Sequence, residues 1–126
     1  MDEAEQIASQ AIRALDDRKG VDIVRVDLRG IMNCFCSFFV ICHGTSGQHV
    51  AGLADHVRET VQDALGEKPA HVEGMNQATW VLLDYGSTVV HVFQREQREY
   101  YQLEEFWADA GITKIEENTP IYYGRK

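Results

Sequence analysis

The segment TWVLLDYGSTVVHVFQ, residues 79–94, reads as two β-strands joined by a tight turn. Each half is rich in β-branched and aromatic residues, and the two residues between the halves, Gly86 and Ser87, suit a two-residue hairpin. Pairing Tyr85 with Thr88 sets the register of the two strands. The segment therefore predicts an antiparallel hairpin of defined register.

Side chains alternate across a strand, and this alternation divides the hairpin into two unlike faces. One face is wholly aliphatic and predicts core: Val81, Leu83, Val90 and Val92. The other face mixes aromatic, acidic and imidazole groups: Trp80, Leu82, Asp84, Val89, His91 and Phe93. Aromatic groups anchor interfaces and polar groups orient a partner, so the second face predicts a binding surface. A bulge at Gly86 would exchange the faces, and a core position for Trp80 beneath a helix is the competing interpretation.

The composition is that of one globular domain: 126 residues, 44% apolar and 25% charged. No apolar run approaches the roughly 20 residues of a bilayer span. The acidic residues 1–6 resemble neither a secretory signal nor a transit peptide. A net charge of −8 argues against direct nucleic-acid binding and favours a basic protein as partner.

The three cysteines are Cys34, Cys36 and Cys42. An odd number of thiols without a signal peptide predicts reduced cysteines and a cytoplasmic protein. With His43 they match no common zinc module, and strand alternation places Cys42 and His43 on opposite faces. We therefore expect no metal and no cofactor.

Hydrophobic periodicity predicts three helices and five strands along the chain. The helices are expected over residues 2–18, 47–65 and 95–110, and the strands over residues 21–28, 37–43, 69–73, 79–85 and 88–94. This order predicts an α/β or α+β fold, with a mixed β-sheet flanked by helices. Residues 1–110 are expected to form a single domain, and residues 111–126, which show no clear period, a mobile C-terminal tail.

Signals for catalysis are weak. The turn Gly44–Ser46 lies between a strand and a helix but lacks the lysine of a Walker loop, so helix capping is the better interpretation. A nucleotidyltransferase would need paired acids on a nearby strand, whereas Asp84 stands alone. Cys42 or Ser46 could act as a nucleophile, but no base is placed beside either residue.

The last predicted helix is a second candidate for a partner surface. Its candidate residues are Arg98, Tyr101, Leu103, Glu104 and Trp107. The stronger interpretation places Leu103 and Trp107 in the core and leaves Arg98 and Glu104 as surface or paired charges.

Several motifs together resemble the ribosomal silencing factor family, also termed Iojap-like. They occur in order between Glu5 and Ala110, and the series from Trp80 to Trp107 is the most specific part. The matching segments are residues 22–24, 39–46, 73–74, 80–86, 90–93 and 98–104 followed by Trp107. One departure is local: many members carry Thr-Asp-Tyr where this chain has Cys36, Ser37 and Phe38.

The resemblance implies a nucleotidyltransferase-like fold without catalytic acids and a protein that is not an enzyme. It implies a translation repressor that binds the large ribosomal subunit through ribosomal protein L fourteen and sterically blocks joining of the small subunit. It also implies a homodimer when the protein is free. The partner-facing residues carried over by position are Trp80, Asp84 and Tyr85, with Leu82, His91 and Glu73 nearby. Strict alternation places Tyr85 on the opposite face from Trp80 and Asp84, so it would reach the same surface only from the end of the strand.

Two other functions stay open at this point. One is a metal-dependent enzyme of nucleotidyltransferase type, and the other is a homodimeric adaptor for a different basic protein.

Overall fold

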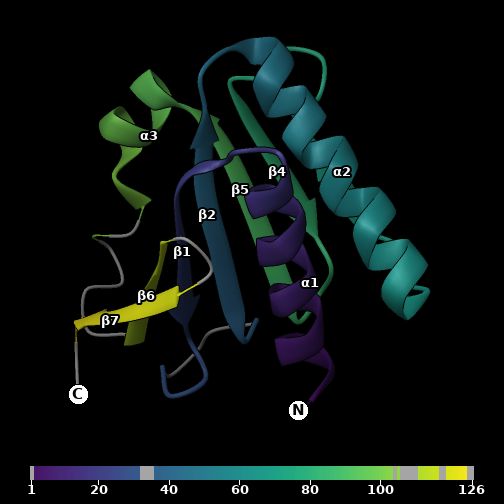
Figure 1. Cartoon of the computed structure of the whole chain (residues 1–126), viewed down its shortest axis with the longest axis vertical. Coiled ribbons are helices and arrows are strands. Elements are labelled where there is room, and N and C mark those ends of the chain that lie inside the picture. Colours follow the sequence, from purple (N-terminus) through teal and green to yellow (C-terminus); the bar gives the residue numbers. More distant parts are fainter. Residues whose placement is uncertain (1, 32–35, 104, 106–110, 117–118, 125–126) are drawn as a thin grey trace.

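The computed structural model describes residues 2–31, 36–103, 105, 111–116 and 119–124. In this part of the chain, two long helices pack against one face of a mixed sheet (Figure 1). The helices are α1 (Glu3–Asp17), α2 (Gly47–Leu65) and α3 (Arg95–Tyr101). The strands are β1 (Val21–Asp27), β2 (Phe38–Gly44), β3 (His71–Glu73), β4 (Trp80–Asp84), β5 (Thr88–Gln94), β6 (Gly111–Glu116) and β7 (Thr119–Gly124). None of these helices combines the length and the hydropathy that crossing a membrane requires.

The strands follow the order β3-β4-β5-β2-β1-β6-β7 across the sheet. β2 and β5 run parallel, and the other neighbouring pairs are antiparallel. This mixed sheet flanked by helices confirms the predicted α+β class, and the first eight elements occur in the predicted order. β2 is buried at all but one of its positions, as expected of a strand covered on both faces.

Both long helices begin at a capping side chain. The Asp2 carboxylate accepts the Glu5 N–H at 2.8 Å, and the Glu5 carboxylate accepts the Asp2 N–H at 3.3 Å, which forms a capping box for α1. At the start of α2 the Ser46 hydroxyl accepts the His49 N–H at 3.0 Å. Gly66 ends this helix with a φ of +69°, a conformation that glycine adopts without strain. α2 thus spans the predicted residues, and the turn before it serves as its cap.

The main core lies between the sheet and the helices α1 and α2. The aliphatic face of the hairpin lies in this core, and its four residues are fully buried: Val81, Leu83, Val90 and Val92. The Tyr85 N–H donates to the Thr88 carbonyl at 2.9 Å, and Asp84 pairs with Val89. The predicted register and the predicted division of faces are therefore confirmed.

A second apolar cluster lies on the face of the sheet away from α1 and α2, which we term the rear face. Its buried residues are Val24, Val26, Leu28, Ile41 and Phe93. Trp80, Phe39 and Leu103 are partly buried against it. The rear face therefore has an apolar layer of its own, contributed by β1 and β2 as well as by the hairpin.

α3 is shorter than the predicted helix over residues 95–110. It ends at Tyr101, because Gln102 adopts a left-handed conformation with φ +47° and donates its N–H to the Arg98 carbonyl. The turn directs Leu103 back onto the rear-face cluster. Residues 104 and 106–110, including Trp107, lie outside the described residues.

Residues 111–116 and 119–124 form strands, where the sequence predicted a tail without regular structure. β6 pairs with β1, with Ile112 opposite Val26, and β7 pairs with β6. The outer edge of β1 would otherwise expose unpaired backbone N–H and C=O groups, which β6 satisfies. Ile112 packs against the rear-face cluster and Ile115 against the main core, so the side chains of β6 do alternate between the two faces of the sheet. The alternation extends over too few residues to stand out in the sequence.

Candidate partner-binding surface

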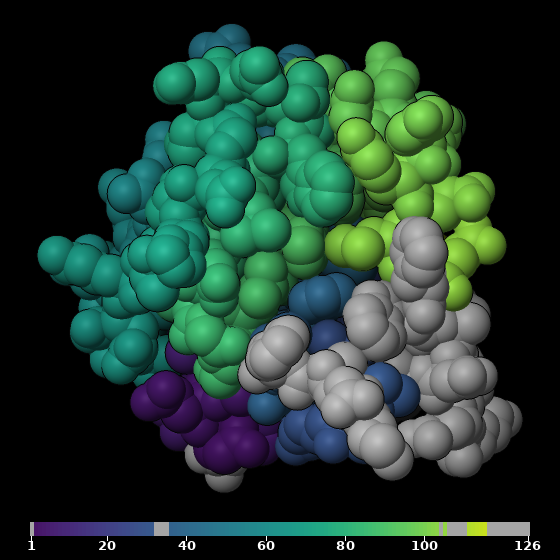
Figure 2. All heavy atoms as spheres, turned by 180° about the vertical axis from the view of Figure 1, so that it is seen from behind, coloured from purple at the N-terminus to yellow at the C-terminus, as the bar shows by residue number. Residues whose placement is uncertain are grey.

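Four of the predicted partner-facing residues lie together on the rear face near one edge of the sheet. β4 directs Trp80, Leu82 and Asp84 to this side, and the pairing of Glu73 with Leu82 brings Glu73 to the same side. Figure 2 shows the molecule from behind, with the hairpin in green next to α3 in yellow-green. We term Glu73, Trp80, Leu82 and Asp84 the docking surface.

Trp80 is half-buried. Its position is therefore intermediate between the binding surface and the core, the two places that the sequence allowed. Its ring stacks on Phe93 with the centroids 4.8 Å apart and lies at the same distance from the ring of Tyr101. The indole N–H donates to Nδ1 of His91 at 3.1 Å. Trp80 is therefore held in one orientation by its neighbours, and only part of its ring is available to a partner.

His91 lies beneath the predicted surface and not on it, which corrects its predicted position. Its side chain is 4% exposed and lies among the rings of Phe39, Trp80 and Phe93. Because Nδ1 accepts the indole N–H, the ring proton must lie on Nε2. Burial disfavours a second proton and lowers the pKa of His91 to about 4. His91 thus acts beneath the surface, as the acceptor that orients Trp80.

Two carboxylates lie on the same face of the sheet as Trp80, in different environments. Glu73 is exposed and makes no ion pair with a described residue. Asp84 is half-buried, and one of its oxygens accepts the Gly86 N–H at 2.8 Å, which supports the hairpin turn. Asp84 therefore has a structural role in the turn as well as a negative charge at the surface.

Tyr85 lies on the other side of the sheet, as strict alternation predicted. Its ring packs against the main core beneath the helices. Burial raises the pKa of its hydroxyl to about 12. Tyr85 is therefore separate from the docking surface in this structure, which corrects its assignment as a partner-facing residue.

α3 is fixed to the sheet by Arg98, a role that its predicted place among surface or paired charges did not include. Arg98 is 8% exposed, and one of its guanidinium nitrogens donates to Nδ1 of His43 at 3.0 Å and to the Val21 carbonyl at 3.2 Å. This anchoring places Tyr101 against Trp80. The sequence contained one sign of this arrangement: Arg98 and Tyr101 are three residues apart, which puts both on one side of a helix.

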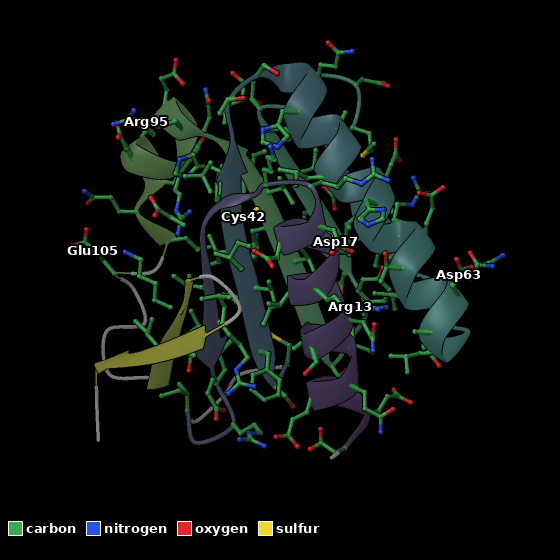
Figure 3. The ribbon with its side chains drawn as sticks, in the orientation of Figure 1. Arg13, Asp17, Cys42, Asp63, Arg95 and Glu105 are labelled. Carbon is green, nitrogen blue, oxygen red and sulfur yellow. The ribbon has the colours of Figure 1, made fainter. Side chains whose placement is uncertain are left out.

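A cavity of about 590 Å³ lies between β1 and α3. Its charged lining is balanced: Asp22, Glu99 and Glu105 against Arg95, Arg98 and Lys114. Figure 3 shows Arg95 on α3 and Glu105 beyond it. His43 also lines the cavity. Burial together with the charge of Arg98 lowers the pKa of His43. Among the described residues, no three His, Cys, Asp or Glu side chains are grouped as metal ligands would be.

Gly74 shapes the edge of the docking surface. It adopts a φ of +85°, and a Cβ at this position would meet the backbone carbonyl of Trp80. We expect Gly74→Ala to lower the free energy of unfolding by about 2 kcal/mol or more, because left-handed strain and a backbone clash add. Urea denaturation measures the change. Gly52→Ala is the matched control, because Gly52 lies in α2 with open space around it and should gain up to about 1 kcal/mol. Equal effects of the two substitutions would contradict the prediction.

Comparison with known proteins identifies the family. Residues 1–122 match the family model described as Ribosomal silencing factor during starvation. The chain belongs to the ribosomal silencing factor family. Ribosomal silencing factor RsfS of Halalkalibacterium halodurans is 38% identical over 112 residues, which cover 89% of this chain and 94% of that protein. A crystal structure of a Chromobacterium violaceum protein superposes with a TM-score of 0.79 at 34% identity and covers 84% of this chain and 87% of that one. The mouse protein named Mitochondrial assembly of ribosomal large subunit protein 1 is 31% identical over 75 residues, covering 58% of this chain and 33% of its own length.

Membership of the ribosomal silencing factor family confirms the resemblance inferred from the hairpin and its flanking motifs. It identifies the chain as a ribosome-associated regulator of translation. The family match extends to residue 122 and so includes β6, which the sequence resemblance had left outside.

Proposed function

We propose that this protein represses translation by binding the large ribosomal subunit through ribosomal protein L fourteen and blocking the joining of the small subunit. The observation that carries the proposal is the docking surface: a half-exposed indole with two carboxylates, Asp84 and Glu73, on the same face of the sheet. Family membership supports it, because the relatives are named as ribosomal silencing factors.

The proposed mechanism is steric and makes or breaks no covalent bond. Ribosomal protein L fourteen lies where the two subunits join, as the family resemblance implies, so a 14.3 kDa domain bound there would occupy space that the small subunit needs. The proposal also includes a cytoplasmic location and a homodimer for the free chain.

Charge supports a ribosomal protein as the partner. The chain carries a net charge of −8, and ribosomal proteins are basic because they contact RNA. Carboxylates at the docking surface can accept charge-assisted hydrogen bonds from arginine or lysine of the partner. Opposite net charges also speed the encounter, and salt weakens this attraction.

A subunit-joining assay tests the proposal. Purified small and large subunits are incubated with increasing amounts of the protein, and a density gradient measures how many whole ribosomes form. We expect wild-type protein to reduce joining. Asp84→Asn should require about tenfold more protein for the same effect, because it removes one charged hydrogen bond.

The substitution Asp84→Asn keeps an oxygen that can accept the Gly86 N–H, so the hairpin turn is preserved. Asp63→Asn is the matched control, because Asp63 lies on α2, across the molecule from Arg95 on α3 (Figure 3). It makes the same change of charge and should inhibit like wild type. Undiminished joining in the presence of saturating wild-type protein would reject the proposed function.

A further inference from the structure

The most exposed large apolar side chains in the described part of the chain are two neighbouring tyrosines of α3. Tyr100 is 81% exposed and Tyr101 is 44% exposed. A single exposed aromatic residue needs no explanation, but these two continue directly from the docking surface. The ring centroids of Tyr101 and Trp80 are 4.8 Å apart, and those of Tyr100 and Tyr101 are 5.1 Å apart.

The three rings form a line from the sheet onto the helix. Trp80 is packed between neighbours and half-buried, whereas each step along the line is more exposed than the last. The buried Arg98 holds α3 on the sheet through His43 and the Val21 carbonyl, so the tyrosines are presented from an anchored backbone. The outermost aromatic surface is therefore supplied by Tyr100 and Tyr101, with Trp80 as their support.

The chemistry of this line restricts what it can bind. The indole N–H of Trp80 is already donated to the buried His91, so this part of the surface offers ring faces and not an indole donor. Acidic groups accompany the rings: Glu96 lies one helical turn before Tyr100, and Glu99 precedes Tyr100 directly. Glu99 is paired with Arg95 at 3.1 Å, whereas Glu96 makes no ion pair with another described residue.

We propose that Tyr100 and Tyr101 extend the docking surface and bind an arginine side chain of the cationic protein partner by stacking against its guanidinium group. This inference rests on the proposed function and adds the recognition chemistry of the same surface. A guanidinium group is planar and weakly hydrated, so it can lie flat on an aromatic ring beside a carboxylate. Two other occupants fit this surface less well. A lysine ammonium is a strongly hydrated point charge. A purely apolar segment would leave Glu96 unpaired.

Two substitutions at Tyr100 separate ring stacking from simple apolar contact. Tyr100→Phe keeps the ring and removes the hydroxyl, whereas Tyr100→Leu keeps an apolar side chain and removes the ring. Because Tyr100 is 81% exposed, neither change disturbs the core. Affinity for purified large subunits is measured by titration and sedimentation. We expect Tyr100→Leu to bind about fivefold or more weakly and Tyr100→Phe to bind within about twofold of wild type.

A photo-crosslink identifies the partner group. Benzoylphenylalanine at position 100 should crosslink to one protein of the large subunit, at a peptide that contains arginine. The same probe at position 58, on the exposed side of α2, is the control and should not crosslink there.

The outcomes distinguish this inference from the proposed function. Loss of binding with Tyr100→Leu but not with Tyr100→Phe supports it. Wild-type binding by Tyr100→Leu overturns it, and the proposed function still stands if a change at Trp80 abolishes binding. Equal losses with both tyrosine variants overturn ring stacking in favour of the hydroxyl. Wild-type binding by Tyr100 and Trp80 variants alike overturns both the inference and the proposed docking surface.

Discussion

Trp80→Ala should abolish co-sedimentation with large ribosomal subunits at concentrations where the wild-type protein binds. Truncation of an interface anchor costs about 2 kcal/mol or more, roughly thirtyfold in affinity. The same change should also lower the free energy of unfolding by about 3 kcal/mol, because it leaves a space beside Phe93 and leaves His91 without its donor. Sedimentation of the variant with purified subunits measures the first effect, and urea denaturation measures the second.

Because Trp80→Ala weakens the fold as well as the surface, a second variant is needed to assign the loss to the surface. Leu82→Arg places a positive charge on the same face, opposite Glu73 on β3, where the new pair of charges preserves the strand pairing. It should bind subunits as poorly as Trp80→Ala while unfolding at nearly the wild-type urea concentration. Wild-type co-sedimentation by both variants would place the binding site elsewhere on the molecule.

Acidification should destabilise this protein through His91. The pKa of His91 is about 4 in the folded chain and 6.5 in an unfolded one. Well above pH 6.5 the imidazole is neutral in both states, and the group contributes nothing to the pH dependence. As the pH falls from 6.5 to 4, the unfolded chain binds a proton that the folded chain excludes. The free energy of unfolding should therefore decrease by about 3 kcal/mol over this range.

His91→Gln isolates this contribution. The glutamine oxygen can accept the indole N–H of Trp80, but the side chain does not titrate. Urea denaturation at pH 7 and pH 4.5 should show a smaller loss of stability for the variant than for wild type. Part of the loss should persist, because burial also lowers the pKa of His43, and this shift has the same sign. Equal losses in the two proteins would mean that His91 is reached by water in the folded state.

Local patterns were sufficient to predict the hairpin and both long helices. A strand places successive side chains on opposite faces, so the aliphatic residues Val81, Leu83, Val90 and Val92 could be assigned to one buried face without knowledge of the partner elements. Both ends of α2 were predicted correctly, because Ser46 and Gly66 cap the helix and are adjacent to it in the sequence. The family, too, was evident from motifs along the chain.

What only the tertiary structure decided depends on contacts between distant segments. The hairpin sequence could not show that α3 and the strands β1 and β2 supply rings and aliphatic groups that bury His91 and partly cover Trp80. Arg98 has no local sign of burial, because its acceptors, His43 and the Val21 carbonyl, lie more than fifty residues away. β6 pairs with β1 because the outer edge of β1 would otherwise have unpaired backbone groups. Such an edge exists only once the sheet has assembled, so the local sequence does not show it. Alternation and capping act between near neighbours and are visible in the sequence, whereas burial is decided by whichever segments pack on a face once the chain has folded.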